Sequence, residues 1–283
     1  MRVLLCAPTY FDVPETDIDN KHMDPKNRPN FLLAKAQHDA LIQTYENLGL
    51  EVWLIPPRKG LVDMTFTANC GFAVGKKFVL SNYKPLRRRE EAGHFKEFFE
   101  SLGYQVFILP EGVFFEGGGD AVLYKDKILC GYGFRTSKDA LPYLERFLEK
   151  EVVLLELIKP SRGDKNFYHF DTTIIVLEDI ESFISYRGAF SRESWNRLES
   201  LGEVLPASYQ DAANLALNAV VAPKRELNDS LRKLDIRGSV VTSALASQPL
   251  IRTLQAMKYQ PVLVNLSEFL KSGGGAFCLT KVF

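Results

Sequence analysis

A repeat of about 51 residues is the feature that most constrains the fold of this chain. Asn69, Asp120 and Asp171 each stand at the head of an apolar stretch with hairpin character, and each is 51 residues from the next. A fixed period of this length indicates a repeated supersecondary unit rather than a doubly wound sheet. The sequence therefore predicts an α/β fold built from copies of one unit, in which a hairpin is followed by a helix and a further strand.

The remaining elements follow the same order along the chain. Hairpins are predicted to begin in the stretches 66–81, 115–131, 168–177 and 212–223, and a fifth begins in GGGAFCLTKVF at the C-terminus. Helices are predicted at 87–102, 137–150, 191–201, 225–235 and 247–258. Strands that close the units are predicted at 104–110, 152–158 and 259–265.

The first segments of the chain complete the unit that the last segment opens. Residues 2–7 and 51–56 have the character of strands, and the helix expected at 31–49 is capped by Asn30 and ended by Gly49. We therefore expect the two ends of the chain to meet, which closes a ring of about five units without a free sheet edge. Nothing in the sequence marks a linker, so residues 1–283 are predicted to form a single domain.

Composition and cysteine spacing exclude several classes of protein. The 35 basic and 35 acidic residues cancel without a basic tail, so nucleic acid is not an expected partner. No run reaches the ~18 apolar residues of a membrane span and no signal peptide is evident, so the predicted location is the cytoplasm. Neither a disulfide framework nor a zinc site is expected, because the cysteines are far apart, at Cys6, Cys70, Cys130 and Cys278.

Glu116 and Asp120 enclose three glycines in the stretch FEGGGD. Glycine weakens a strand, so three in a row favour a place where a ligand or a second backbone segment comes close. The alternative is a tight turn that carries two solvated acids.

His169 and Asp171 lie two residues apart in YHFDT, and in a strand their side chains would share one face. A histidine beside a carboxylate can act as a general acid or base, and the alternative is a hydrogen bond of purely structural value. The other histidines, His22, His38 and His94, are interpreted as ordinary surface residues.

Cys278 follows the glycines Gly273, Gly274 and Gly275 and has apolar neighbours on both sides. Glycines permit backbone shapes that other residues resist and let another group approach closely. A cysteine so placed is a candidate nucleophile, provided that its thiolate is accessible and stabilised.

These motifs head separate repeats of the predicted ring, so we expect them to point at the same central hole. A thiol, an imidazole and carboxylates suit covalent catalysis on a planar cation such as a guanidinium group. Carboxylates bind a guanidinium through paired, charge-assisted hydrogen bonds, which would hold its carbon within reach of the thiolate.

The chain resembles the guanidino-group modifying enzymes, the pentein superfamily, which includes arginine deiminase, arginine dihydrolase, dimethylarginine dimethylaminohydrolase and the amidinotransferases. The resemblance runs nearly end to end and implies a five-bladed αβ propeller. It rests on the DMTFTAN stretch at 63–69, on Arg88, on FEGGGD, on Arg135 within GYGFRTS, on His169 to Thr172, and on Cys278.

The resemblance also implies a role for each matched residue. Cys278 attacks the guanidinium carbon to form a thiouronium intermediate, and His169 moves protons to the departing amine and from the attacking water. Glu116 and Asp171 bind the guanidinium group. The remaining matched residues bind the rest of the substrate: Arg88 and Arg135 its α-carboxylate, Phe66 its aliphatic part, and Asp63 its α-amino end. No metal and no cofactor is implied, the expected partner is a small guanidino compound, and the sequence leaves a homo-oligomer open.

Two asparagines decide the order of the candidate activities. Deiminases and dimethylargininases carry an acid where this chain has Asn69, whereas arginine dihydrolases carry asparagine there and at the position of Asn20. An amide can donate a hydrogen bond to a urea oxygen, which a carboxylate cannot do. We therefore place arginine dihydrolase, giving ornithine, before arginine deiminase, giving citrulline, and dimethylargininase third.

Two further alternatives remain. An amidinotransferase shares the thiouronium step and passes the amidino group to an amine instead of water. A non-enzymatic binding factor of the same fold is disfavoured, because such factors lack the cysteine, histidine and carboxylate set.

Overall fold

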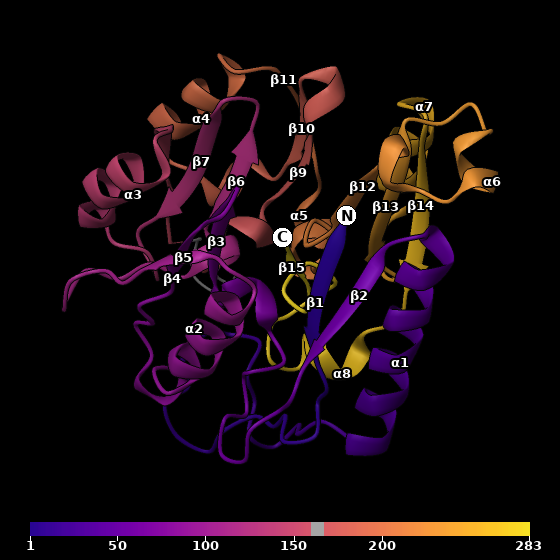
Figure 1. Ribbon diagram of the computed structural model, residues 1–283. Coiled ribbons are helices and arrows are strands. Elements are labelled where there is room, and N and C mark those ends of the chain that lie inside the picture. Colours follow the sequence, from indigo (N-terminus) through magenta and orange to yellow (C-terminus); the bar gives the residue numbers. More distant parts are fainter. Residues whose placement is uncertain (160–166) are drawn as a thin grey trace. The chain divides into compact units, whose positions relative to one another are not determined.

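A computed structural model describes residues 1–159 and 167–283 of the chain (Figure 1). The chain forms two compact units, and each is described by itself. The terminal unit consists of Met1–Thr67 and Ala207–Phe283, and the middle unit of Ala68–Pro206.

The middle unit contains three sheets of three strands, and all three share one topology. In each sheet the first strand is antiparallel to the second, and the second is parallel to the third. A helix connects each parallel pair, as parallel strands require a crossover. The elements are β3 (Gly71–Val74), β4 (Lys77–Leu80), α2 (Glu91–Ser101) and β5 (Gln105–Phe107); β6 (Ala121–Tyr124), β7 (Lys127–Tyr132), α3 (Leu141–Leu148) and β8 (Glu151–Glu156); and β9 (Ile174–Leu177), β10 (Ser182–Ser185), α4 (Arg192–Glu199) and β11 (Glu203–Pro206).

The terminal unit contains two sheets with the same topology. One is formed by β12 (Val220–Pro223), β13 (Gly238–Ser243) and β14 (Tyr259–Val264), with α7 (Gln248–Ala256) before the last strand. The other is formed by β15 (Lys281–Val282), β1 (Arg2–Cys6) and β2 (Glu51–Ile55), with α1 (Phe31–Leu48) before the last strand. Short helices complete the unit: α5 (Tyr209–Ala213), α6 (Asp229–Arg232) and α8 (Ser267–Leu270).

The predicted meeting of the two ends is confirmed. Strand β15 pairs with β1 so that Val282 lies opposite Val3, and Figure 1 shows the yellow C-terminal strand beside the indigo N-terminal one. The predicted order of hairpin, helix and strand is found in the three sheets of the middle unit. In the sheet of β12, β13 and β14 the short helix α6 stands between the first two strands, and in the sheet of β15, β1 and β2 the first two strands come from opposite ends of the chain.

Helix α1 forms where its sequence signals place it. The Oδ1 atom of Asn30 accepts a hydrogen bond from the backbone N of Leu33 (3.0 Å), and Gly49 ends the helix with φ of 92°. His38 lies on the inward face of α1 with Ala34, Leu41 and Tyr45, and is only 2% exposed. The interpretation of His38 as a surface residue was therefore wrong, since the i, i+4 spacing turns it toward the core; His22, at 9% exposed, is also buried.

The heads of the hairpins differ from the prediction. The glycines of FEGGGD form a 3₁₀ turn, Gly117–Gly119, and strand β6 begins only at Ala121. Phe170–Thr172 is a second such turn, so His169 and Asp171 do not lie on one face of a strand as predicted. Each of these turns lies shortly before a strand, β6 or β9, and carries or adjoins the polar side chains at that place.

Some elements were placed inexactly or missed. Helix α2 begins at Glu91 rather than 87, because Leu86–Arg88 forms a 3₁₀ turn first. Strand β13 was not predicted, since GSVVTS has no apolar alternation, yet all six of its residues are buried. Among residues 1–159 and 167–283, no helix has the length and apolar character needed to cross a membrane.

Each unit has its own hydrophobic core. In the terminal unit, side chains from α1, β1 and β12 to β14 pack with Phe66, Phe269 and Cys278. In the middle unit, Phe115, Ile128 and Leu144 belong to a cluster that joins β6 and β7 to α3. Cys6, Cys70 and Cys130 are fully buried.

Candidate functional site

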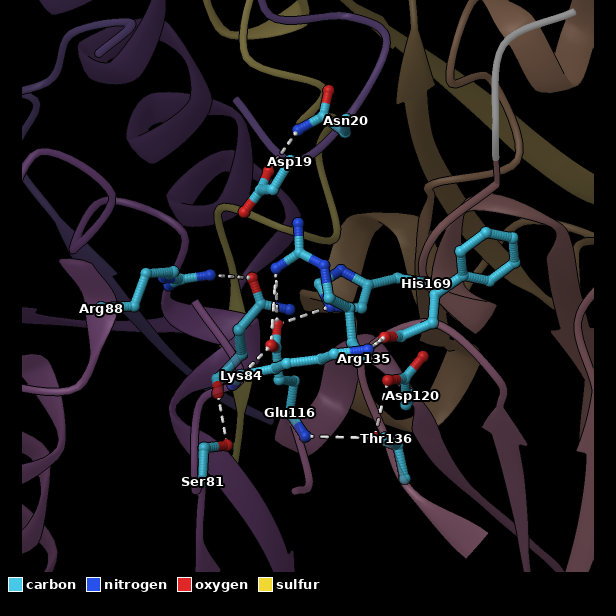
Figure 2. Close-up of polar contacts among 12 residues, drawn as sticks. Asp19, Asn20, Ser81, Lys84, Arg88, Glu116, Asp120, Arg135, Thr136 and His169 are labelled. Carbon is cyan, nitrogen blue, oxygen red and sulfur yellow. Dashed lines mark hydrogen bonds and ion pairs between the residues drawn. The ribbon is translucent and has the colours of Figure 1, made fainter. Parts of the chain in front are cut away.

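Glu116 and His169 form a buried pair in the middle unit. Each residue immediately precedes a 3₁₀ turn, and the two are 0% and 2% exposed. The Nε2 atom of His169 lies 2.8 Å from Oε2 of Glu116, and Nη1 of Arg135 lies 3.2 Å from the same oxygen. Figure 2 shows the imidazole and the guanidinium directed at this one carboxylate.

The charges of this group move two pKa values in opposite directions. Burial raises the pKa of Glu116, but the Arg135 cation and the His169 hydrogen bond outweigh it and hold that pKa well below its ordinary value of 4.5. Burial lowers the pKa of His169, but the carboxylates of Asp120 and Glu116 outweigh it and keep that pKa above 6.5. The pair is therefore biased toward a carboxylate and an imidazolium.

Asp120 links the two segments that carry this pair. Its Oδ1 accepts a hydrogen bond from the backbone N of Phe170 (3.0 Å), and its Oδ2 accepts one from Oγ1 of Thr136 (2.7 Å). The same Thr136 oxygen accepts a hydrogen bond from the backbone N of Glu116 (3.2 Å), as Figure 2 shows. Burial raises the pKa of Asp120. Asp120 thus fixes the backbone that follows His169 relative to the backbone at Glu116.

Arg88 determines how the amide of Asn69 is oriented. Arg88 pairs with Glu91 through Nε and Nη2 (3.0 and 2.9 Å) and donates from Nη1 to Oδ1 of Asn69 (2.9 Å). Because a guanidinium group only donates hydrogen bonds, the amide oxygen faces Arg88 and the NH2 group faces away. Arg88, Glu91 and Asn69 are all buried, so water does not compete for these contacts.

The NH2 group of Asn69 lies over Gly119 and beside His169. Nδ2 has no hydrogen-bond partner among the described residues. A β-carbon at Gly119 would collide with this nitrogen and would lie 3.2 Å from the His169 ring. The third glycine of FEGGGD therefore leaves space for an amide donor next to an imidazole.

Gly117 is required for a different reason. Its φ is 54°, and a β-carbon there would lie 2.5 Å from the backbone N of Gly71. The close approach predicted for FEGGGD thus includes the backbone of Gly71, the first residue of β3.

Arg135 also contacts an aromatic ring, and Asp171 lies in the turn that follows His169. The guanidinium carbon of Arg135 lies 5.0 Å from the centroid of the Tyr168 ring, and the residue is 6% exposed. Asp171, which is 7% exposed, belongs to the 3₁₀ turn that directly follows His169. The middle unit therefore combines carboxylates, an imidazole, an amide donor and two guanidinium groups in buried positions.

Cys278 lies in the loop before β15 in the terminal unit and is 2% exposed. The Nδ2 atom of Asn218 donates a hydrogen bond to its Sγ (3.1 Å), and Oδ1 of Asn218 accepts one from the backbone N of Cys278 (2.9 Å). Asn218 was not among the predicted site residues. Its sequence signal is a single amide inside the apolar run LALNAVVA, just before β12.

The glycines before Cys278 make room for side chains. Gly273 has φ of 87°, which favours glycine. A β-carbon at Gly274 would collide with the ring of Phe66, and one at Gly275 would lie 2.9 Å from Oδ1 of Asn218. The cysteine loop is thus shaped by close packing against Phe66 and Asn218.

Asn20 is connected to the same loop. Its Nδ2 donates to the carbonyl of Ser272 (3.3 Å) and to Asp19 (3.3 Å), and its Oδ1 accepts from the backbone N of His22 (2.9 Å). Figure 2 includes the contact with Asp19. Asn20 therefore ties the segment before α1 to the residue that precedes Gly273.

Asp63 and Phe66 are also buried in the terminal unit, at 2% and 5% exposed. The backbone N of Phe66 donates to the carbonyl of Asp63 (2.9 Å), and its ring meets Phe11 edge-on at 5.5 Å. Thr67, at the end of the same stretch, accepts a hydrogen bond from the backbone N of Lys281 (3.1 Å) and donates to Leu279 (2.9 Å). The DMTFTAN stretch is therefore anchored to the segment that carries Cys278.

The predicted site residues fall into two groups. The middle unit carries six of them and joins most by direct contacts: Glu116, His169, Asp171, Asn69, Arg88 and Arg135. The terminal unit carries the others: Cys278, Asn20, Asp63 and Phe66. Within residues 1–159 and 167–283, no group of three or more His, Cys, Asp or Glu side chains is arranged to hold a metal ion.

Known proteins resemble the chain over nearly all of its length. The bifunctional arginine dihydrolase/ornithine cyclodeaminase AgrE of Nostoc sp. is 36% identical over 99% of this chain and 37% of AgrE, so the chain spans little more than a third of that relative. The N(G),N(G)-dimethylarginine dimethylaminohydrolase of Mycobacterium tuberculosis is 33% identical over 99% of this chain and 84% of its own length.

A solved structure agrees with these relatives. The N-terminal domain of ArgZ, determined as a variant covalently bound to a reaction intermediate, has a TM-score of 0.86 and 33% identity, and the match covers 99% of this chain and 96% of that domain. The family profile described as "N,N dimethylarginine dimethylhydrolase, eukaryotic" matches residues 7–282. By these matches, the chain belongs to the dimethylarginine dimethylhydrolase family, within the pentein superfamily of guanidino-group modifying enzymes.

Proposed function

We propose that the chain is a hydrolase that acts on the guanidinium carbon of arginine or a close relative and releases ammonia. The favoured reaction is that of an arginine dihydrolase, in which arginine and two waters give ornithine, two ammonia molecules and carbon dioxide. Single hydrolysis by an arginine deiminase, which gives citrulline and one ammonia, is the close alternative. The substrate is a small molecule, and the proposed chemistry uses side chains of the chain alone.

The relatives support the reaction class. The match covers 96% of the ArgZ N-terminal domain, which has been solved with a covalent intermediate and with product and is described as an arginine dihydrolase. The ornithine cyclodeaminase activity in the names of AgrE and ArgZ is not part of the proposal, because the match covers only 37% of those proteins.

The buried groups suit each step of this chemistry. The Cys278 thiolate would attack the guanidinium carbon, and the resulting tetrahedral adduct would expel ammonia to leave a thiouronium. His169, biased toward its protonated form by Glu116, would give a proton to the departing amine and take one from the attacking water. Glu116 and Asp171 would bind the guanidinium group.

The other predicted residues would hold the rest of the substrate. Arg88 and Arg135 are proposed to bind the α-carboxylate, and Arg88 also orients the amide of Asn69. Asp63 is proposed near the α-amino end and Phe66 against the aliphatic chain. Asn20, which is tied to Ser272 next to the cysteine loop, is proposed to contact the substrate from the segment before α1.

The orientation of Asn69 is the observation that favours two hydrolytic steps over one. Its NH2 group, fixed by Arg88 and Glu91, is a buried donor beside the His169 ring. After the first hydrolysis the guanidinium carbon carries a urea oxygen, which needs a donor. An amide supplies that donor and a carboxylate repels the oxygen, so the citrulline-like product would stay bound for a second attack.

We also propose that the five sheets form the blades of one propeller and that residues 1–283 are a single domain. Support comes from the identical topology of the five sheets and from the sheet that joins the first and last strands of the chain. Each of the five sheets keeps two edge strands, so the proposed propeller would leave short edges and not the complete absence of free edges expected from the sequence.

The test is a product analysis with purified protein and arginine. We expect two ammonia molecules and one ornithine for each arginine consumed; a ratio near one, with citrulline, identifies a deiminase instead. Cys278→Ser should lower turnover by at least about 10⁴-fold while arginine still binds. Cys130→Ser, at a buried cysteine outside the proposed site, is the matched control and should retain turnover.

Asn69→Asp tests the two-step proposal directly. The carboxylate keeps an acceptor for Arg88 but removes the NH2 donor, so the product should shift from ornithine toward citrulline. The exposed Asn196→Asp is the control and should leave the product ratio unchanged. Ornithine production that is unaffected by Asn69→Asp contradicts the proposed role.

Dimethylargininase is the third candidate, and the family profile and the M. tuberculosis relative favour it. Release of dimethylamine from dimethylated arginine, faster than release of ammonia from arginine, would identify this activity. The same assays with glycine as acceptor detect an amidinotransferase, which would form a new guanidino compound in place of ammonia. With ornithine as acceptor the transfer regenerates arginine, so isotopically labelled ornithine is needed to detect it.

A further inference from the structure

Asn218 is completely buried and accepts three hydrogen bonds from the backbone of the cysteine loop. Its Oδ1 accepts hydrogen bonds from the backbone N of Cys278 (2.9 Å) and of Gly275 (3.1 Å). Its backbone carbonyl accepts a third from the backbone N of Phe277 (3.2 Å). Asn218, which lies shortly before β12, thus holds the loop that carries Cys278 through both its side chain and its backbone.

These contacts settle which end of the amide faces the sulfur. Both backbone groups that approach Oδ1 are obligatory donors, so the atom between them must be the oxygen. The NH2 group then has to face Cys278, and Nδ2 lies 3.1 Å from Sγ. The sulfur of Cys278 is therefore the acceptor in this hydrogen bond.

Other cysteines of the chain have the opposite arrangement. The Sγ of Cys130 donates toward the carbonyl of Gly131 (3.7 Å), and the Sγ of Cys6 donates toward the carbonyl of Ala7 (3.8 Å). A thiol that donates to a carbonyl is favoured in its protonated form, whereas a sulfur that accepts from an N–H group is favoured as the thiolate. Cys278 differs from these two cysteines in this respect.

We propose that Asn218 is a positioning residue for the nucleophile, which holds the Cys278 loop through Oδ1 and stabilises the thiolate through Nδ2. This rests on the proposed function only in taking Cys278 as the nucleophile. Gly275 contributes to the same arrangement, because a β-carbon there would lie 2.9 Å from Oδ1 of Asn218 and displace the amide. The hydrogen bond is made by a neutral group, so it lowers the cost of the negative sulfur without adding a second charge.

The test measures the reactivity of the sulfur without any substrate. The rate of iodoacetamide alkylation at Cys278, located by mass spectrometry, is recorded from pH 5 to 10 for the full chain and for Asn218→Ser, which lacks the NH2 donor. We expect the midpoint of the pH–rate profile to rise by about one to two pH units and the rate at pH 6 to fall by about 10- to 100-fold. The plateau rate at high pH should change little.

The shape of the profile separates this role from a merely structural one. A loosened loop would change the plateau rate through accessibility, whereas loss of a thiolate donor moves the midpoint. Asn218→Asp is the second variant, since it keeps an oxygen for the two backbone donors and places a negative charge beside the sulfur; its midpoint should rise at least as far. Asn214→Asp, whose amide bonds the carbonyl of Leu245 instead, is the control and should match the parent.

Turnover supplies an independent readout. In Asn218→Ser, kcat with arginine should fall by about 10- to 100-fold with little change in KM, because the donor acts on the nucleophile and not on substrate binding. An unchanged alkylation midpoint in both folded variants overturns the inference and leaves the proposed function standing. If the midpoint shifts in the variants but the parent protein does not turn over any guanidino compound, the inference is supported and the proposed function is rejected.

Discussion

Two histidines with the same burial behave in opposite ways. His38 on α1 of the terminal unit and His169 in the middle unit are each 2% exposed. Burial lowers the pKa of His38 to about 4, since only the exposed Asp39, 4.0 Å away, opposes it. His169 has two buried carboxylates as neighbours, Asp120 and Glu116, and its pKa rises instead.

The comparison shows that partners, and not burial, distinguish a chemically useful histidine from a core residue. Nε2 of His38 has no hydrogen-bond partner among the described residues, so the neutral ring is the cheaper form there. Nε2 of His169 lies 2.8 Å from Glu116, so the charged ring is stabilised. A histidine that must take and give protons needs the second environment.

The change with the largest expected effect removes the carboxylate of Glu116, the hydrogen-bond partner of His169. Glu116→Ala leaves the Arg135 guanidinium buried without its anion and should destabilise the protein by about 3–5 kcal/mol, measured by urea unfolding. The pKa of His169, followed by NMR titration of its ring protons, should fall because its hydrogen-bonded anion is gone.

Glu193→Ala in α4 is the control, because that carboxylate is 82% exposed where it pairs with Arg197. It should leave the unfolding free energy nearly unchanged. Equal losses in the two variants would contradict the view that the Glu116 cluster depends on buried charge.

The second test uses the opposite signs of the two pKa changes. His38 has a lower pKa folded than unfolded, so its contribution to stability is present above pH 6.5 and is lost as the pH falls toward 4, by about 3 kcal/mol. His169 has a higher pKa folded than unfolded, so its contribution is present below pH 6.5 and is lost as the pH rises through the folded value.

Unfolding free energies from pH 4 to 9 measure both effects. The difference between the parent and His38→Gln should grow as the pH rises from 4 to 6.5. The difference between the parent and His169→Gln should shrink as the pH rises above 6.5. If both differences grow, or both shrink, as the pH rises through these ranges, the two histidines do not differ in the way described.

The sequence predicted correctly those features of the fold that depend on interactions between residues close together in the chain. Asn30 and Gly49 fix the ends of α1 through contacts within a few residues, and the 51-residue spacing revealed the repeated unit. The family motifs identified Glu116 and His169, which are in direct contact across 53 positions of the chain.

Long-range contacts could not be predicted in the same way. The sulfur of Cys278 and the amide of Asn218 are 60 positions apart, and nothing near either residue indicates the hydrogen bond. His38 shares its residue type with His169, and only the packing of α1 decides that it is buried without a strong partner. The strand prediction for YHFDT was wrong because the 3₁₀ turn depends on Asp120, which accepts a hydrogen bond from Phe170 across 50 positions.

The smallest test concerns the second carboxylate beside His169. In Asp120→Asn the amide oxygen would face the backbone N of Phe170, an obligatory donor, and the NH2 group would face Oγ1 of Thr136. That hydroxyl can rotate to accept, so both hydrogen bonds survive in changed form and the expected cost is only about 1 kcal/mol.

The negative charge of Asp120 is nevertheless lost in this variant, and the pKa of His169 should change as a result. Asp120 is the largest influence that raises the pKa of His169, so that pKa should fall in Asp120→Asn while remaining above the value in Glu116→Ala, which loses the direct hydrogen bond as well. Asp120→Ala is the control for the backbone contact, because it leaves the buried N–H of Phe170 without an acceptor and should cost about 1–3 kcal/mol. If the pKa of His169 is the same in Asp120→Asn as in the parent, then Glu116 alone makes His169 different from His38, and Asp120 serves only to hold the backbone.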